Sequence, residues 1–122
     1  MKVAVYGTLK QGGALHAHMN GMKYLETKMY TGYEMYKVTG AFYPAVVPSP
    51  ECPFCTITVE VYEGDEGDLH NLDLVEGFNE DDPETSLYVR QKMNDGAWLY
   101  IAGPWLNVDE HRRIPEGDFY VG

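Results

Sequence analysis

The chain has 122 residues, of which 44% are hydrophobic, and its formal net charge is −10. This length and composition suit one domain with a buried core, so we expect a single domain over residues 1–122. The strong negative charge argues against nucleic acid and anionic membranes as partners, because both require a basic surface.

The first half of the chain carries short strand patterns between glycines and prolines. Residues 2–6 alternate weakly in polarity and predict a first strand. Its apolar part is too short for a signal peptide, and no stretch approaches the about 20 apolar residues of a membrane helix, so we expect a cytoplasmic location. A glycine-rich loop at 7–13 and a short helical turn at 14–19 follow. Further strands are predicted at 33–38 and 56–62, with a short apolar piece at 45–47 between them.

One helix is predicted over residues 66–76. Asp65 is a suitable N-cap, and acidic residues in the first turn favour the helix dipole. Apolar residues recur at helical spacing from Leu69 to Val75, and Gly77 is a natural end.

After the helix the sequence predicts an acidic loop at 79–85 and two strands at 87–93 and 97–102. Asn94-Asp95-Gly96 between the strands is typical of a tight hairpin turn. The tail from Gly103 onward is expected to be irregular and to pack its aromatic residues across the body, where it either caps a pocket or forms an interface. We therefore predict an α+β fold with a mixed, curled or barrel-like sheet of about five to six strands and one or two short helices.

Glu76 is the first candidate for chemistry. Around the helix axis Glu76 falls between Leu69 and Leu72, inside the apolar stripe. Asp73 lies about 40° from Leu69, on the side away from Leu72. A carboxylate that faces a core must find a partner or its pKa rises, which suits a general acid or base. The alternative is a structurally paired or surface glutamate at a frayed helix end.

The second candidate is the turn after the first strand, Tyr6-Gly7-Thr8-Leu9. Glycine permits a tight turn and close approach of a ligand. Successive backbone N–H groups in such a turn bind anions or carbonyl oxygens. An ordinary connection between strand and loop has the same sequence pattern.

Cys52 and Cys55 form a C-x-x-C pair surrounded by prolines, with three interpretations: half a zinc site, a redox pair, or loop residues without chemistry. A closed zinc site requires four ligands, and the histidines lack zinc-finger spacing. Neither serine lies in a nucleophile elbow, and no nucleotide-binding motif is present. We expect no cofactor and no metal.

Taken together, three motifs resemble the γ-glutamylcyclotransferase-like family, which includes γ-glutamylamine cyclotransferase and AIG2-like proteins. They occur in the family's order: Tyr6-Gly7-Thr8-Leu9-Lys10, Leu72-Asp73-Leu74-Val75-Glu76-Gly77 and Tyr88-Val89-Arg90. His16, Phe42-Tyr43-Pro44-Ala45 and Val59-Glu60-Val61-Tyr62 are supporting matches. The resemblance spans roughly residues 3–102.

The resemblance implies a small α+β fold and a cofactor-free reaction. In that reaction the α-amine of a γ-glutamyl compound attacks its γ-carbonyl, releases an amine and leaves 5-oxoproline. The family's catalytic glutamate falls on Glu76, and its substrate-binding turn on Tyr6, Gly7, Thr8 and Leu9. Tyr88 is expected to hydrogen-bond Glu76 or the substrate. Arg90 contacts either the substrate or, as we favour, a structural carboxylate.

Two alternatives remain open at this stage. The domain is either this enzyme, acting on a small γ-glutamyl substrate, or a non-catalytic module that binds a carboxylate or a protein terminus in the same pocket. A metal-stabilised accessory protein that uses Cys52 and Cys55 is a third hypothesis. We expect a monomer or a weak homodimer. The long acidic loop at 79–85 and the cysteine pair depart from the family pattern.

Overall fold

The structure is a computed structural model that describes residues 1–41 and 43–119. Phe42, from one supporting motif, and the last three residues of the predicted tail lie outside the described residues. The strands are β1 Lys2–Val5, β2 Lys23–Thr31, β3 Tyr33–Val38, β4 Pro44–Pro48, β5 Thr56–Glu63, β6 Tyr88–Lys92, β7 Ala97–Ala102 and β8 Val108–Ile114. The helices are α1 Glu66–Glu76 and two 3-10 turns, η1 His16–Met19 and η2 Pro83–Thr85.

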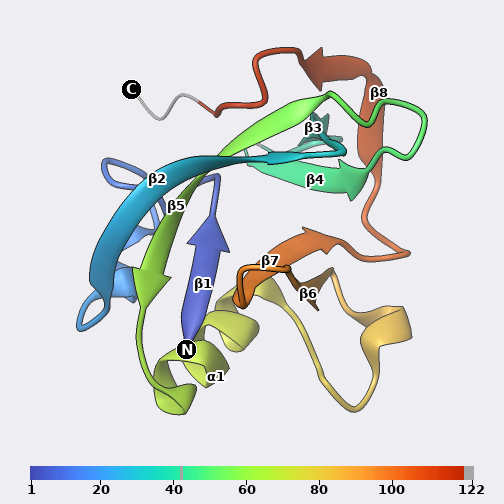
Figure 1. Cartoon of the computed structure of the whole chain (residues 1–122). Helices are drawn as coiled ribbons and strands as arrows, with labels where there is room; N and C mark the ends of the chain where they lie inside the picture. Colours follow the sequence, from blue (N-terminus) through green and yellow to red (C-terminus); the bar gives the residue numbers. More distant parts are fainter. Residues whose placement is uncertain (42, 120–122) are drawn as a thin grey trace.

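The strands form two sheets (Figure 1). The larger has the order β2-β5-β1-β7-β6, and the smaller has the order β4-β3-β8. Strand β1 pairs antiparallel with β5 and parallel with β7, so the larger sheet is mixed. The mixed α+β fold predicted from the sequence is confirmed.

Strand β1 lies at the centre of the molecule and is buried on both faces. Val3 and Val5 pack in one apolar cluster with Leu72 of α1. Ala4, on the opposite face, packs in a second cluster with Met35 of β3. The alternation of side chains along a strand therefore divides the core in two, with β1 between the helix and the smaller sheet.

Helix α1 has the bounds that the sequence predicted. The Asp65 side chain accepts a hydrogen bond from the Asp68 N–H, and the Asp68 side chain accepts one from the Asp65 N–H. Gly77 ends the helix in the left-handed conformation, at φ 67°. These local contacts fix where the helix begins and where it ends, and Glu76 is its last residue.

The predicted strand count of five to six was wrong, because the described residues contain eight strands. Strand β2 was missed since most of its side chains are exposed, which leaves no apolar alternation to detect. The predicted irregular tail contains β8, a polar strand that pairs with β3. Beyond β8, Phe119 packs against the core as expected, whereas Trp105 remains 75% exposed.

In the described part of the chain, every helix is too short or too polar to cross a membrane.

Candidate active site

A pocket of about 140 Å³ lies where the C-terminal end of α1 meets the loop after β1. Strands β4, β6 and β7 also contribute to its wall. All six residues singled out in the sequence line this pocket: Tyr6, Gly7, Thr8, Leu9, Glu76 and Tyr88. The fold therefore brings together residues that lie up to 82 positions apart in the chain.

Glu76 lines this pocket without a partner. No described residue forms a hydrogen bond or an ion pair with its carboxylate. Burial raises the pKa of this carboxyl from 4.5 to about 7, because the charged form loses hydration that no protein group replaces. Near neutral pH the side chain is therefore divided between acid and base forms, as a proton-transfer group requires.

Tyr6 and Tyr88 form part of the pocket wall that also contains Glu76. The Tyr6 hydroxyl donates to the Tyr100 carbonyl at 2.7 Å and accepts from the Val46 N–H at 3.3 Å. The Tyr88 hydroxyl donates to the Pro44 carbonyl at 2.8 Å. Tyr88 thus makes a backbone hydrogen bond, and the expected one to Glu76 is not formed.

These tyrosines remain neutral. Burial raises the pKa of Tyr6 and of Tyr88, and the nearby Glu76 charge raises both further. A neutral phenol with its proton already committed to a carbonyl supplies shape to the pocket rather than a proton. Glu76 is accordingly the group in this wall suited to move a proton near pH 7.

The turn after β1 lines the same pocket and contains N–H groups that the fold does not use. The Lys10 N–H donates to the Gly7 carbonyl at 3.1 Å, which makes Thr8 and Leu9 the central residues of the turn. Their own N–H groups have no acceptor among the described residues. Such N–H groups can bind a carboxylate or a developing oxyanion.

Contacts from the rest of the loop hold this turn in place. The Leu15 N–H donates to the Thr8 carbonyl at 3.0 Å, and His16 Nδ1 lies 2.8 Å from the Leu9 carbonyl. A Cβ atom on Gly13 would lie 2.2 Å from the Thr8 carbonyl oxygen, so only glycine fits there. The turn is therefore shaped before any ligand arrives.

A buried ion pair anchors α1 one turn before Glu76. Asp73 accepts from Arg90 Nε at 3.0 Å and from the Tyr100 hydroxyl at 2.6 Å. The Arg90 guanidinium also stacks over Trp98, at 4.3 Å from the ring centre. Arg90 is thus neutralised by a structural carboxylate, as the sequence favoured, and no cation of the described residues pairs with Glu76.

Sequence reasoning missed the anchoring role of Asp73 and Tyr100. A signal was present for Asp73, since helical spacing put it beside the apolar stripe, where a carboxylate needs a partner. Tyr100 carried no such signal, because its contact with Asp73 depends on how β7 packs against α1.

The cysteine pair lies outside this pocket. Cys52 and Cys55 are joined by a disulfide in the loop between β4 and β5. Neither residue lines the pocket that contains Glu76.

Comparison with known proteins gives one consistent relationship. The family model "Gamma-glutamyl cyclotransferase, AIG2-like" matches residues 3–121. A Pyrococcus horikoshii protein named "Putative gamma-glutamylcyclotransferase PH0828" is 32% identical over 98% of this chain and 90% of its own length. The crystal structure of PH0828 superposes with a TM-score of 0.70, covering 97% of this chain and 88% of that one.

Two further relatives agree. "AIG2-like protein B" of Arabidopsis thaliana is 26% identical over 96% of this chain and 66% of its own length. The solution structure of Escherichia coli ytfP is 28% identical, with a TM-score of 0.63 and coverage of 97% of this chain and 95% of that one. The chain therefore belongs to the γ-glutamyl cyclotransferase, AIG2-like family.

Proposed function

We propose that this protein is an enzyme that cyclises a γ-glutamyl amine or γ-glutamyl peptide to 5-oxoproline, with Glu76 as general acid and base. The observation that carries the proposal is a carboxylate of pKa about 7 that has no partner among the described residues and lies in a pocket also lined by Thr8 and Leu9, whose N–H groups have no acceptor there. Membership of the family supplies the reaction class.

The first step is attack on the γ-carbonyl. The substrate's α-amine is mostly protonated near neutral pH, so the Glu76 carboxylate accepts a proton from it. The nitrogen then forms a bond to the γ-carbonyl carbon, and the carbonyl oxygen gains negative charge. Donors at Thr8 and Leu9 stabilise that oxygen, or the substrate carboxylate.

The second step is release of the amine. The ring nitrogen gives up its second proton to solvent, and Glu76 returns its own proton to the departing nitrogen. The oxyanion then re-forms the carbonyl as the bond between the departing nitrogen and the carbonyl carbon breaks. The new ring is 5-oxoproline, and no water enters the product. Because nucleophile and carbonyl belong to one molecule, the pocket has only to hold the reactive conformer.

The test is release of 5-oxoproline from a panel of γ-glutamyl amines and dipeptides. We expect release by the wild type and loss by at least about a hundredfold in Glu76→Gln, the usual size of a general acid–base contribution. Glu66→Gln is the matched control, since Glu66 is an exposed glutamate on the same helix and lies outside the pocket.

A non-catalytic binding module is the alternative, and the free N–H groups of the turn favour it equally. If calorimetry detects a γ-glutamyl ligand that neither wild type nor Glu76→Gln converts, with similar affinity in both, the protein is a binding module. Turnover that survives in Glu76→Gln would also contradict the assigned role.

A further inference from the structure

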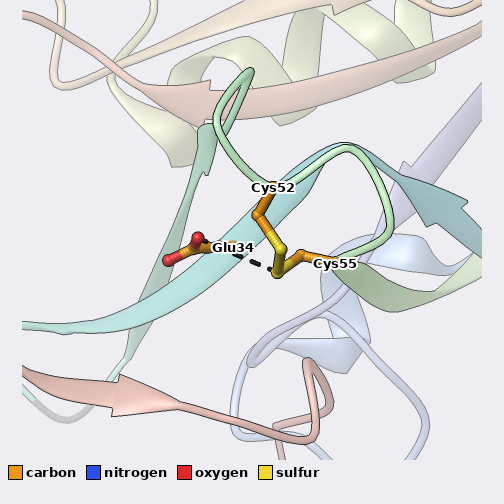
Figure 2. Close-up of side chains that lie close together, drawn as sticks. All are labelled: Glu34, Cys52 and Cys55. Carbon is orange, nitrogen blue, oxygen red and sulfur yellow. Dashed lines mark hydrogen bonds between the residues drawn. A yellow bond between two sulfur atoms is a disulfide. The ribbon is translucent and has the colours of Figure 1, made fainter.

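A cluster of side chains that could bind a metal ion lies outside the pocket. Figure 2 shows the Cys52–Cys55 disulfide beside the Glu34 carboxylate. The Cys55 sulfur lies 3.9 Å from Glu34 Oε1. One ligand atom from each of the three residues lies within 4.8 Å of the others. Glu34 comes from β3, and the cysteines come from the loop between β4 and β5.

The Glu34 carboxylate is held in position by its neighbours. The Ser49 hydroxyl donates to one oxygen at 2.7 Å, and the Tyr36 hydroxyl donates to the other at 2.6 Å. Arg113 Nε lies 3.3 Å from that second oxygen. Carboxylates that bind metals are oriented by hydrogen bonds of this kind.

We propose that reduction of the Cys52–Cys55 disulfide opens a binding site for a soft divalent cation of the Zn²⁺ class, with Cys52, Cys55 and Glu34 as its ligands. An external phosphine or dithiol supplies two electrons, and solvent supplies two protons, so the S–S bond becomes two thiols. The cation then displaces both thiol protons and forms two sulfur–metal bonds. Water completes a four-coordinate site.

The surrounding charges suit that occupant. Two thiolates and one carboxylate carry three negative charges, which a divalent cation and the Arg113 guanidinium together neutralise. Arg113 already lies 3.5 Å from the Cys55 sulfur. Thiolate ligands select Zn²⁺ and similar ions over Mg²⁺ and Ca²⁺, which prefer oxygen.

Metal binding at this site depends on the oxidation state of the two sulfurs. All three residues are only partly buried, so both a reductant and an ion can reach them. In the disulfide neither sulfur carries the negative charge that a metal ligand of this kind provides. The loop therefore has two exclusive states, a disulfide or a metal-bound dithiolate.

The test uses Co²⁺ as a spectroscopic substitute for Zn²⁺. One sample of the protein is reduced anaerobically with a phosphine, and a second is left oxidised. Both are freed of metal with a chelator and then titrated with Co²⁺. We expect one equivalent to bind the reduced chain with sulfur-to-cobalt charge-transfer absorption, and no such absorption from the oxidised chain. Absence of the absorption in reduced protein, or identical Co²⁺ binding by both forms, would overturn the proposal.

Substitutions then test each ligand. Cys52→Ser should abolish the absorption, and Glu34→Gln should weaken Co²⁺ binding at least about tenfold. Glu51→Gln is the matched control, because Glu51 is an exposed glutamate beside Cys52 that does not belong to the cluster. Circular dichroism of each metal-free variant verifies folding. Unchanged affinity in folded Glu34→Gln would exclude Glu34 as a ligand.

Discussion

Replacement of Glu76 by glutamine should stabilise the protein, and the gain should grow with pH. Burial raises the carboxyl pKa from 4.5 to about 7, so the folded state keeps a proton that the unfolded chain releases between these values. Stability is therefore lost as the pH rises through that window, since the native state binds more protons there. Glutamine has no charge to bury and escapes this loss.

The pKa shift sets the size of the effect. Each unit of difference between the folded and unfolded pKa changes the free energy of unfolding by about 1.4 kcal/mol. A rise from 4.5 to about 7 therefore lowers the stability of the wild type by about 3 kcal/mol above pH 7. Glu76 keeps partial access to the pocket, which makes this an upper value. At about pH 5 the expected difference is under about 1 kcal/mol.

Urea unfolding at a series of pH values measures this difference directly. The free energies of unfolding of wild type and Glu76→Gln should diverge from about pH 5 to about pH 8, with the variant more stable at the upper end. Glu66→Gln corrects for the loss of an exposed charge on the same helix. The assignment of a raised pKa would be refuted if this stability difference stayed constant with pH. It would also be refuted if the wild type became more stable relative to the variant as the pH rises.

Three further outcomes follow from the site. Asp73→Asn removes the buried ionic partner of Arg90 and leaves it only the exposed Glu80 carboxylate at 3.8 Å, so urea unfolding should show a loss of about 3 kcal/mol; full stability would contradict the anchoring role. Gly13→Ala forces a Cβ against the Thr8 carbonyl, and thermal unfolding should report destabilisation of about 1–3 kcal/mol with weaker substrate binding. In the proposed reaction kcat/KM should rise as the pH increases toward about 7, where Glu76 becomes a base; a profile flat from pH 5 to 7 would count against it.

Local sequence signals predicted α1 to its last residue. The capping residue Asp65 and the terminating Gly77 act on their immediate neighbours, so no knowledge of the rest of the fold is needed. The hairpin turn at Asn94–Gly96 is local in the same way. The Ala97 N–H donates to the Asp95 side chain at 2.9 Å, and the Gly96 φ is 90°.

The two missed strands show where local signals fail. Strands β2 and β8 are edge strands of their sheets, and solvent covers most of their side chains. A strand without a buried face needs no apolar alternation, and its pairing is determined by partners distant in the sequence. The tail was therefore predicted to be irregular where it pairs with β3.

In the candidate site, too, some features could be predicted from the sequence and others could not. The position of Glu76 inside the apolar stripe was readable from helical spacing, and its proximity to the Tyr6–Leu9 turn followed from the family resemblance. The Asp73–Arg90–Tyr100 contacts and the neighbours of Glu34 were not readable, because each joins elements that only the folded chain brings together.

Cyclisation is the central claim, and its most direct test is the fate of oxygen during turnover. Wild-type protein is incubated with a γ-glutamyl amine in oxygen-18-labelled water, and the products are analysed by mass spectrometry. Cyclisation predicts 5-oxoproline without the heavy isotope and an equal amount of free amine. Glutamate carrying one heavy oxygen would identify hydrolysis instead and would contradict the account.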